Sequence, residues 1–216
     1  MTVISVIVGS TRQSRFSEKP AQWIFQHLKK RDVDARLLDL RDFPMPFFDQ
    51  AVGPATPGRA PYENEVVSKW TAAIGASDGF IVVTPEYNYG PPAVLKNAID
   101  WVYPEWNRKA VAFVSYGGVG GARSVQQLRE VAIEVQLGPI RSSVHIPVAT
   151  LMAHFHGGDV DKGLAELLHA ARASDPAKAH ERNRLAVPLR INPVERILQH
   201  RRRTVVILRG DEDEAV

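Results

Sequence analysis

The segment from Gly9 to Ser17 carries residue types that bind a phosphate group. It follows an apolar run, residues 2–8, that is typical of a buried strand, and it precedes a helical pattern with Ser17 as candidate N-cap. Backbone N–H groups, hydroxyls and the helix dipole favour an anion here, and Arg12 and Arg15 add charge-assisted hydrogen bonds. Neither G-x-x-x-x-G-K-[ST] nor G-x-G-x-x-G is present, so the loop is neither a P-loop nor a dinucleotide fingerprint. A hydroxyl-rich loop with arginine fits a terminal phosphate monoester, as in FMN, better than an embedded pyrophosphate. The alternative is an ordinary turn. The candidate residues are Gly9, Ser10, Thr11, Arg12, Arg15, Phe16 and Ser17.

A second candidate loop follows the apolar run of residues 79–83. Its residues are Pro85, Glu86, Tyr87, Asn88 and Tyr89. Aromatic, amide and backbone groups at the carboxyl end of a parallel strand suit a flat heterocycle, and open α/β sheets bind ligands there. Asn88 is the candidate side chain for a ring hydrogen bond, and Tyr87 and Tyr116 are candidate packing walls. The alternative is a surface turn with ordinary turn chemistry.

A third loop follows the apolar run of residues 110–114. It contains Ser115, Tyr116, Gly117 and Gly118, and glycine fills four of the five positions from 117 to 121. Glycine lets the backbone approach a ligand closely or adopt a positive φ. A flexible connection is the alternative. Three successive loops of this kind indicate one shared ligand site.

The elements that position these loops alternate between strands and helices. We predict strands near 2–8, 34–40, 79–84, 109–115 and 140–146, and helices near 17–30, 61–76, 91–103, 120–136 and 159–173. This alternation predicts an α/β fold, a flavodoxin-like three-layer sandwich with a five-stranded parallel sheet of order 2-1-3-4-5.

Two segments fit this pattern poorly. The Pro-rich stretch from Pro44 to Pro61 is too long for a routine connection, so it is either a lid or disordered, with Phe47 and Phe48 covering a site or anchoring the loop. Residues 174–216 carry a basic run and an acidic end. We therefore predict a flavodoxin-like FMN-binding domain over residues 1–173, followed by a charged C-terminal extension that is an arm or disordered.

The chain resembles the NAD(P)H-dependent FMN reductases, a flavodoxin-like family that includes quinone, azo-dye and chromate reductases. The resemblance rests on residues 9–12, 85–88, 95–101 and 115–118, which read Gly-Ser-Thr-Arg, Pro-Glu-Tyr-Asn, Leu-Lys-Asn-Ala-Ile-Asp-Trp and Ser-Tyr-Gly-Gly. In many members the first loop reads Gly-Ser-x-Arg-x-x-Ser-x-Asn, whereas here Arg15 and Ser17 stand at the last two of these positions.

The resemblance implies an enzyme that binds FMN and uses NADPH or NADH as co-substrate. Hydride would pass from the nicotinamide through flavin N5 to FMN, a quinone or a similar small-molecule electron acceptor, in ping-pong order and without a catalytic side chain. The alternative is a flavodoxin-type electron carrier or flavin-binding module without nucleotide oxidation. A homodimer or homotetramer is also expected, with Trp101, Tyr103 and Trp106 either at the interface or capping the core.

The amino-acid composition indicates the cellular compartment and the classes of binding partner. The chain has no cysteine, which fits a reducing compartment, and its start has no basic region before the apolar run. Its apolar runs are shorter than the ~20 residues of a membrane helix. The net charge of +3 is not concentrated in one motif of the first 170 residues. We therefore expect a cytoplasmic protein that binds neither membrane nor nucleic acid.

Two further groupings of residues could in principle form sites of other kinds. His154 and His156, with Asp159 nearby, lack a third ligand in fixed geometry, so we predict no metal. A hydrolase triad of Ser10 or Ser115 with His145 lacks the G-x-S-x-G elbow and is set aside.

Overall fold

The structure is a computed structural model that describes residues 1–173, with side chains to residue 167. The predicted extension, residues 174–216, lies outside the described residues. The strands are β1 (Val3–Val8), β2 (Asp34–Asp39), β3 (Gly79–Pro85), β4 (Ala110–Tyr116), β5 (Gly138–Pro139) and β6 (Val144–Ile146). The helices are α1 (Glu18–Leu28), α2 (Glu65–Gly75), α3 (Ala93–Asp100), the 3₁₀ turn η1 (Pro104–Trp106), α4 (Ala122–Glu134), α5 (Val148–Phe155) and α6 (Val160–Ala173).

The sheet is parallel, with the order β2-β1-β3-β4-β5 and with β6 also pairing with β4. This confirms the predicted flavodoxin-like order, because β1, β3 and β4 are the apolar runs that a sheet covered on both faces needs. Val8 is the register partner of Val83, and Thr84 is that of Ser115. The carboxyl ends of β1, β3 and β4 therefore lie together, and all three predicted loops begin there.

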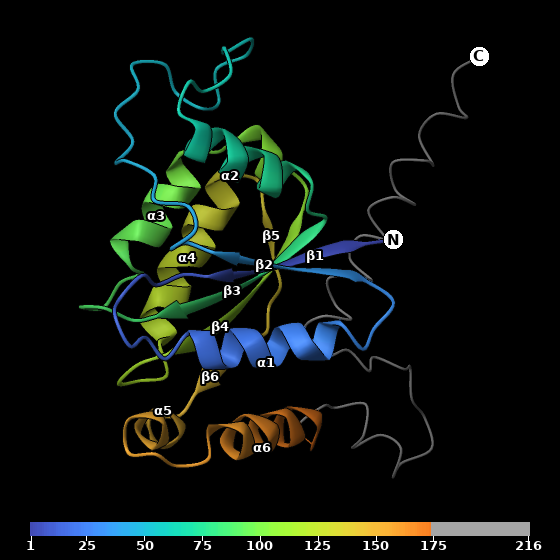
Figure 1. The fold of residues 1–216 in the computed structure, drawn as a ribbon, viewed down its shortest axis with the longest axis vertical. Coiled ribbons are helices and arrows are strands. Elements are labelled where there is room, and N and C mark those ends of the chain that lie inside the picture. Colours follow the sequence, from blue (N-terminus) through green and yellow to red (C-terminus); the bar gives the residue numbers. More distant parts are fainter. Residues whose placement is uncertain (174–216) are drawn as a thin grey trace.

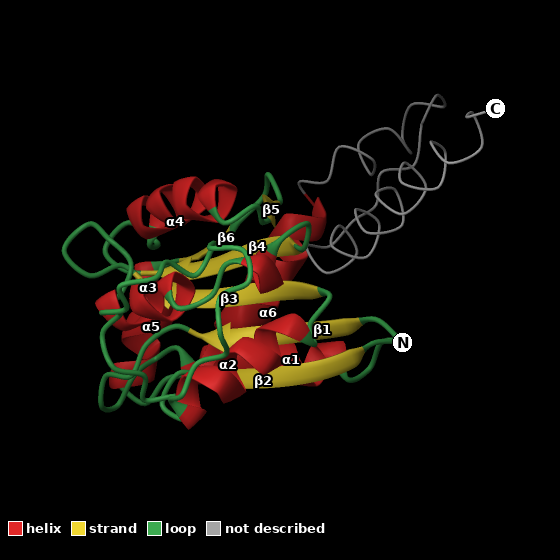
Figure 2. Ribbon diagram, turned by 90° about the horizontal axis from the view of Figure 1, so that it is seen from above, coloured by secondary structure: helices red, strands yellow, loops and turns green. Residues whose placement is uncertain are grey.

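Two apolar cores hold the layers together (Figures 1 and 2). One lies between the sheet and α1, α5 and α6, and it includes Val6 and Leu164. The other lies between the sheet and α2, α3 and α4, and it includes Ile7, Trp70 and Leu128. Neighbouring residues of β1 thus point to opposite cores, as the two-residue period of a strand requires.

The fifth strand differs from the prediction, because it is divided. β5 pairs with the start of β4, and β6 pairs with its end. The N–H groups of Gly138 and Ile140 donate to the carbonyls of Lys109 (2.8 Å) and Val111 (2.9 Å). Pro139 lies between them with its nitrogen on the outer edge of the sheet, where the missing N–H group costs no ladder bond. Arg129 on α4 holds the intervening chain by donating to the carbonyls of Ile140 (2.8 Å) and Arg141 (2.8 Å). Helix α5, which follows β6, was not predicted from the sequence.

The Pro-rich stretch is anchored on α3 at its start. The Pro46 carbonyl accepts hydrogen bonds from Asn97 Nδ2 (2.8 Å) and Trp101 Nε1 (2.8 Å). The Phe48 N–H donates to Asn97 Oδ1 (2.9 Å), and its ring packs edge-on against Trp101. Phe48 is therefore an anchor, whereas the Phe47 side chain is 76% exposed.

Trp101 and Trp106 are core residues, since both side chains are almost fully buried within this one chain. Of the two roles considered for these aromatic residues, the structure therefore favours capping the core, and it removes these two as support for a subunit interface. No helix within residues 1–173 is long and apolar enough to cross a membrane. The cytoplasmic location stays a prediction.

Candidate active site

The first loop begins at Gly9, where the backbone lies so close to β3 and α3 that only glycine fits. The Gly9 N–H donates to the Val83 carbonyl (2.9 Å). A Cβ on Gly9 would lie 2.9 Å from that oxygen and 3.0 Å from a methyl group of Leu95. Gly9 is thus required by packing at the start of the loop. The chain then turns at Ser14, where φ is +49°, before it enters α1.

The end of this loop presents polar groups that the described protein leaves unpaired. Arg15, Phe16 and Ser17 are buried, and the N–H groups of Arg15 and Phe16 donate no hydrogen bond within residues 1–173. Ser17 stands at the N-cap position of α1 but makes no side-chain cap bond. Its fully buried Oγ makes no hydrogen bond of normal geometry in the described part of the chain. Buried donors are nearly always paired in proteins, so this set fits the oxygens of an anion.

Two tyrosine hydroxyls reach this loop from the other two loops. Tyr87 Oη lies 2.8 Å from Ser10 Oγ. Burial raises the pKa of the Tyr116 phenol to about 12 and outweighs the opposing effect of nearby Ser17, which lowers the pKa. Tyr116 is therefore protonated at neutral pH. These contacts were missed from the sequence, which predicts packing walls, because a pattern does not show which side chains meet across loops.

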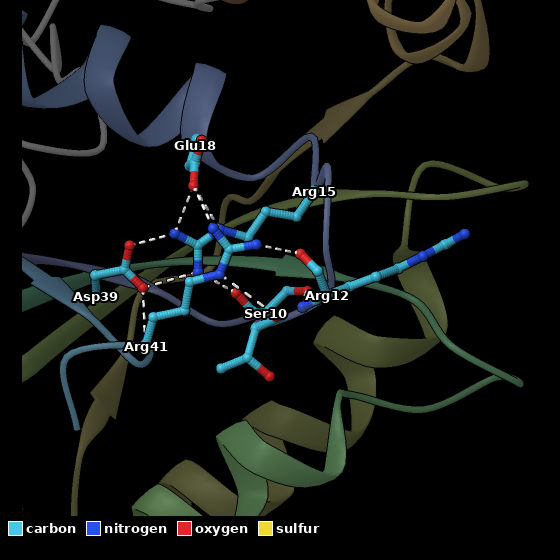
Figure 3. A network of polar contacts seen from close by, with 7 residues as sticks. Ser10, Arg12, Arg15, Glu18, Asp39 and Arg41 are labelled. Carbon is cyan, nitrogen blue, oxygen red and sulfur yellow. Dashed lines mark hydrogen bonds and ion pairs between the residues drawn. The ribbon is translucent and has the colours of Figure 1, made fainter. Parts of the chain in front are cut away.

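The two arginines of the first loop lie in different surroundings (Figure 3). The Arg15 guanidinium is buried and forms ion pairs with Asp39 and Glu18, and its Nη1 donates to the Ser10 carbonyl. Burial alone would lower the pKa of Arg15, but the hydrogen bonds to Asp39 and Glu18 outweigh it and raise the pKa. The exposed Arg12 side chain extends away from this cluster and has no partner among the described residues. Direct phosphate contact by Arg15 stays a prediction, but its donors are already occupied.

The second loop is a tight two-residue turn. The N–H groups of Tyr87 and Gly90 exchange hydrogen bonds with each other's carbonyls (2.9 and 3.0 Å). Asn88 and Tyr89 between them both have positive φ, +49° and +69°, which is the geometry of a type I′ turn. Both are exposed, and the Asn88 amide makes no hydrogen bond within residues 1–173. The Glu86 N–H donates to the Tyr116 carbonyl (2.9 Å), so the N–H groups of Glu86 and Tyr87 are not available to a ligand.

Glu86 connects the second loop to the third. Its buried carboxylate accepts from the backbone N–H of Arg123 (3.0 Å) and from Arg123 Nη1 (2.8 Å). An acidic group at this position caps the first turn of α4 and interacts favourably with the positive end of the helix dipole. The same guanidinium lies 3.8 Å from the centre of the Tyr89 ring. Glu86 therefore holds the loops in place and does not present its carboxylate to a ligand.

The third loop combines one open glycine with crowded ones. A Cβ on Gly118 would have nothing within 4 Å, whereas a Cβ on Gly117 would lie 3.1 Å from that of Glu86. The N–H groups of Gly117 and Gly118 donate no hydrogen bond in the described protein. Gly121, which no sequence pattern marks as a site residue, has φ +78°, and a Cβ there would lie 2.7 Å from Ser115 Cβ. The open N–H groups and the free space fit the edge of a flat ligand.

Ser115 and His145 do not form a nucleophilic pair. The buried Ser115 hydroxyl donates to the Gly120 carbonyl (2.7 Å) and lies 2.9 Å from His145 Nδ1. Because the Ser115 hydroxyl donates its proton to the Gly120 carbonyl, its oxygen accepts a hydrogen bond from the His145 imidazole. The histidine therefore does not act as a base toward Ser115. His154 packs against the Phe16 ring. Within residues 1–173, no three His, Cys, Asp or Glu side chains come together in a way that could hold a metal ion.

The assembled site fits FMN. Unpaired N–H groups and a buried hydroxyl near residues 15–17, with the free Arg12 nearby, fit a terminal phosphate. The exposed Asn88 and the open backbone at Gly117 and Gly118 fit the ring. Thr11 is exposed, and the Phe16 ring is buried against Tyr116 (4.9 Å between centroids), so Phe16 can offer a ligand only its backbone.

Comparisons with known proteins agree with this geometry. The model of a family described as NADPH-dependent FMN reductase matches residues 2–151. An NAD(P)H-dependent FMN reductase of Schizosaccharomyces pombe is 38% identical over 67% of this chain and 73% of its own length. A 2-hydroxy-1,4-benzoquinone reductase of a Burkholderia species is 31% identical over 59% of this chain and 68% of its own. The solved structure of FerB, a flavoenzyme NAD(P)H:(acceptor) oxidoreductase from Paracoccus denitrificans, superposes with a TM-score of 0.58 at 24% identity, covering 79% of this chain and 92% of that one. This last likeness shows the fold.

Proposed function

This chain belongs to the NADPH-dependent FMN reductase family, and from that premise we propose that its first loop holds the FMN phosphate while the other two loops hold the ring. The activity of the family is NAD(P)H-dependent reduction through FMN, and this chain is such an oxidoreductase. The acceptor and the roles of single residues are proposals.

One observation carries the placement of the phosphate. Buried donors near residues 15–17 have no partner in the described protein, at the N-terminus of an eleven-residue helix. A phosphate there would receive backbone hydrogen bonds and the favourable end of the helix dipole. Arg12 is the free cation at this loop, so it supplies the ionic contact.

The other two loops position the ring. Bound FMN supplies the hydride chemistry, which no protein side chain provides. The N–H groups of Gly117 and Gly118 are free to donate to the pyrimidine edge, where they would stabilise negative charge. The Asn88 amide is free for a further hydrogen bond, and the protonated Tyr116 keeps a neutral wall behind the site.

The acceptor that we propose is a small planar compound such as a quinone or free FMN. The loops that would hold the ring include the exposed Asn88, Tyr89 and Gly118, so the ring stays accessible to a second flat molecule. The Burkholderia relative is a benzoquinone reductase, which supports a quinone. Because nicotinamide and acceptor would use the same face in turn, we expect ping-pong kinetics.

The test is oxidation of NADH and of NADPH, followed at 340 nm, with FMN and a panel of quinone, azo and ferric acceptors. We expect nucleotide oxidation to depend on FMN and to give parallel lines in double-reciprocal plots. A protein that binds FMN but oxidises neither nucleotide would instead be an electron carrier. A protein that binds no FMN would contradict the proposed site.

We also propose a homodimer or homotetramer, on the family resemblance. The structure moves the support away from Trp101 and Trp106, which are buried in the core. Light scattering at micromolar concentration tests this proposal, and a mass of 24.0 kDa would contradict it.

A further inference from the structure

Four charged side chains form a cluster on the outer side of the first loop, and we call Arg15, Glu18, Asp39 and Arg41 the outer clamp (Figure 3). Arg15 forms ion pairs with Asp39 and with Glu18 (2.8 Å). Arg41 Nη1 pairs with the same Glu18 oxygen (3.0 Å), and the Arg41 N–H donates to Asp39 Oδ1 (2.9 Å). The clamp joins the first loop, the start of α1 and the end of β2.

The clamp holds three consecutive carbonyl groups of the loop. Arg15 Nη1 donates to the Ser10 carbonyl, and Arg41 donates through Nη2 to that of Arg12 and through Nε to that of Thr11 (3.4 Å). The described chain has no cis peptide bond. In a trans peptide the C=O of one residue and the N–H of the next point in opposite directions. The N–H groups of Thr11, Arg12 and Gln13 therefore point away from the clamp. That of Arg12 donates to Ser10 Oγ (3.3 Å), whereas those of Thr11 and Gln13 donate no hydrogen bond within residues 1–173.

The charges of the clamp cancel. Arg15 and Arg41 contribute two positive charges, and Glu18 and Asp39 contribute two negative ones. The Arg15 side chain is 1% exposed and that of Asp39 is 20% exposed, so the central pair is shielded from salt. Because the cluster is neutral as a whole, it attracts an anion only weakly. The clamp therefore acts on a ligand by orienting the loop, and Arg12 supplies the ionic attraction.

We propose that Asp39 and Arg41 are positioning residues for the FMN phosphate. They act through Arg15 and the loop carbonyls to keep backbone N–H groups aimed at the anion. This inference rests on the proposed function, because it concerns the phosphate loop of the same site. It also gives Arg15, predicted from the sequence to bind the phosphate, an indirect role.

Charge-changing and charge-conserving variants distinguish positioning from attraction. Asp39→Asn makes the clamp more positive, so attraction alone predicts tighter FMN binding, whereas positioning predicts weaker binding. Arg41→Lys keeps the charge but loses the two-armed contact to Thr11 and Arg12, so attraction predicts no change. The matched controls are Asp34→Asn and Arg36→Lys, which alter an ion pair on the same strand that does not contact the loop.

The experiment titrates the full-length apoprotein with FMN and with riboflavin, which lacks the phosphate, and follows flavin fluorescence. We expect Asp39→Asn and Arg41→Lys each to raise the Kd for FMN by about tenfold, the scale of one lost hydrogen bond to a charged group. The Kd of the clamp variants for riboflavin should stay within about twofold of wild type, because riboflavin has no phosphate. The Kd of both control variants for FMN should also stay within about twofold, the usual scale for a surface change away from the site.

Three results would overturn the inference. FMN binding that is unchanged or tighter in both clamp variants would show that orientation is not limiting. An equal loss for riboflavin would show general damage to the site. If the Asp39→Asn variant, at a half-buried position, does not fold, the variant at the exposed Arg41, Arg41→Lys, decides alone. A wild-type protein that binds no FMN would remove the proposed function itself, whereas wild-type binding with unaffected variants would remove only this inference.

Discussion

Replacing Arg12 with alanine should weaken FMN binding without damaging the fold. The Arg12 side chain is exposed and has no partner among the described residues, so its removal leaves no buried charge unpaired. The loss is then the contact with the phosphate alone. A hydrogen bond to a charged group contributes about 1.5–3 kcal/mol, and exposure to solvent puts Arg12 at the lower end of that range.

A loss of about 1.5 kcal/mol corresponds to a Kd for FMN raised a little more than tenfold. Fluorescence titration of the apoprotein measures this change, with riboflavin as the ligand that lacks the phosphate and Arg12→Lys as the variant that keeps the charge. We expect riboflavin affinity to be unchanged and Arg12→Lys to lie between alanine and wild type. Arg12→Ala that binds FMN as tightly as wild type, or loses riboflavin equally, would refute the reasoning.

Three other predictions concern the third loop. Gly118→Val should lose FMN binding and nucleotide oxidation, because its side chain would fill the open space proposed for the ring. The circular dichroism spectrum should stay native, because a Cβ there meets no protein atom within 4 Å, and the control Gly53→Val should leave FMN binding unchanged. Gly121→Ala should instead lower the free energy of unfolding in urea by about 1–3 kcal/mol, because of its φ of +78° and the contact with Ser115; an unchanged denaturation midpoint would contradict this. The raised pKa of Tyr116 predicts stability that is complete below pH 10 and is lost as pH rises toward about 12, and in Tyr116→Phe this loss should shrink.

The sequence was sufficient for the fold because each of β1, β3 and β4 is an apolar run followed by a glycine- or proline-containing loop and a helix. That order alone places residues 9–17, 85–89 and 115–118 at one end of the sheet. The fifth strand was predicted only in part. Its first piece, β5 (Gly138–Pro139), lies before the predicted range of residues 140–146, and its second piece, β6 (Val144–Ile146), covers only the end of that range.

The roles of single side chains were not predictable in the same way, because they depend on contacts between distant residues. Arg41 lies about thirty positions after the loop whose carbonyls it holds, and no local pattern indicates that contact. The tyrosine contacts with Ser10 and Ser17 likewise depend on how three loops pack. Trp101 could be an interface or a core residue by its type alone, and only its burial decides.

The bonds between the loops also bear on how such a site can be redesigned or can diverge. Tyr87 ties the second loop to Ser10 of the first, and Glu86 ties it to Arg123 beyond the third. One of the three loops consequently cannot be replaced without changes in the others. Transplanting the first loop from another protein would leave the Tyr87 hydroxyl without its serine, so Ser10 and Tyr87 have to be exchanged together. Variation at this site is therefore expected to proceed by paired substitutions, and Tyr89, whose ring lies 3.8 Å from the Arg123 guanidinium, is coupled to the same contacts.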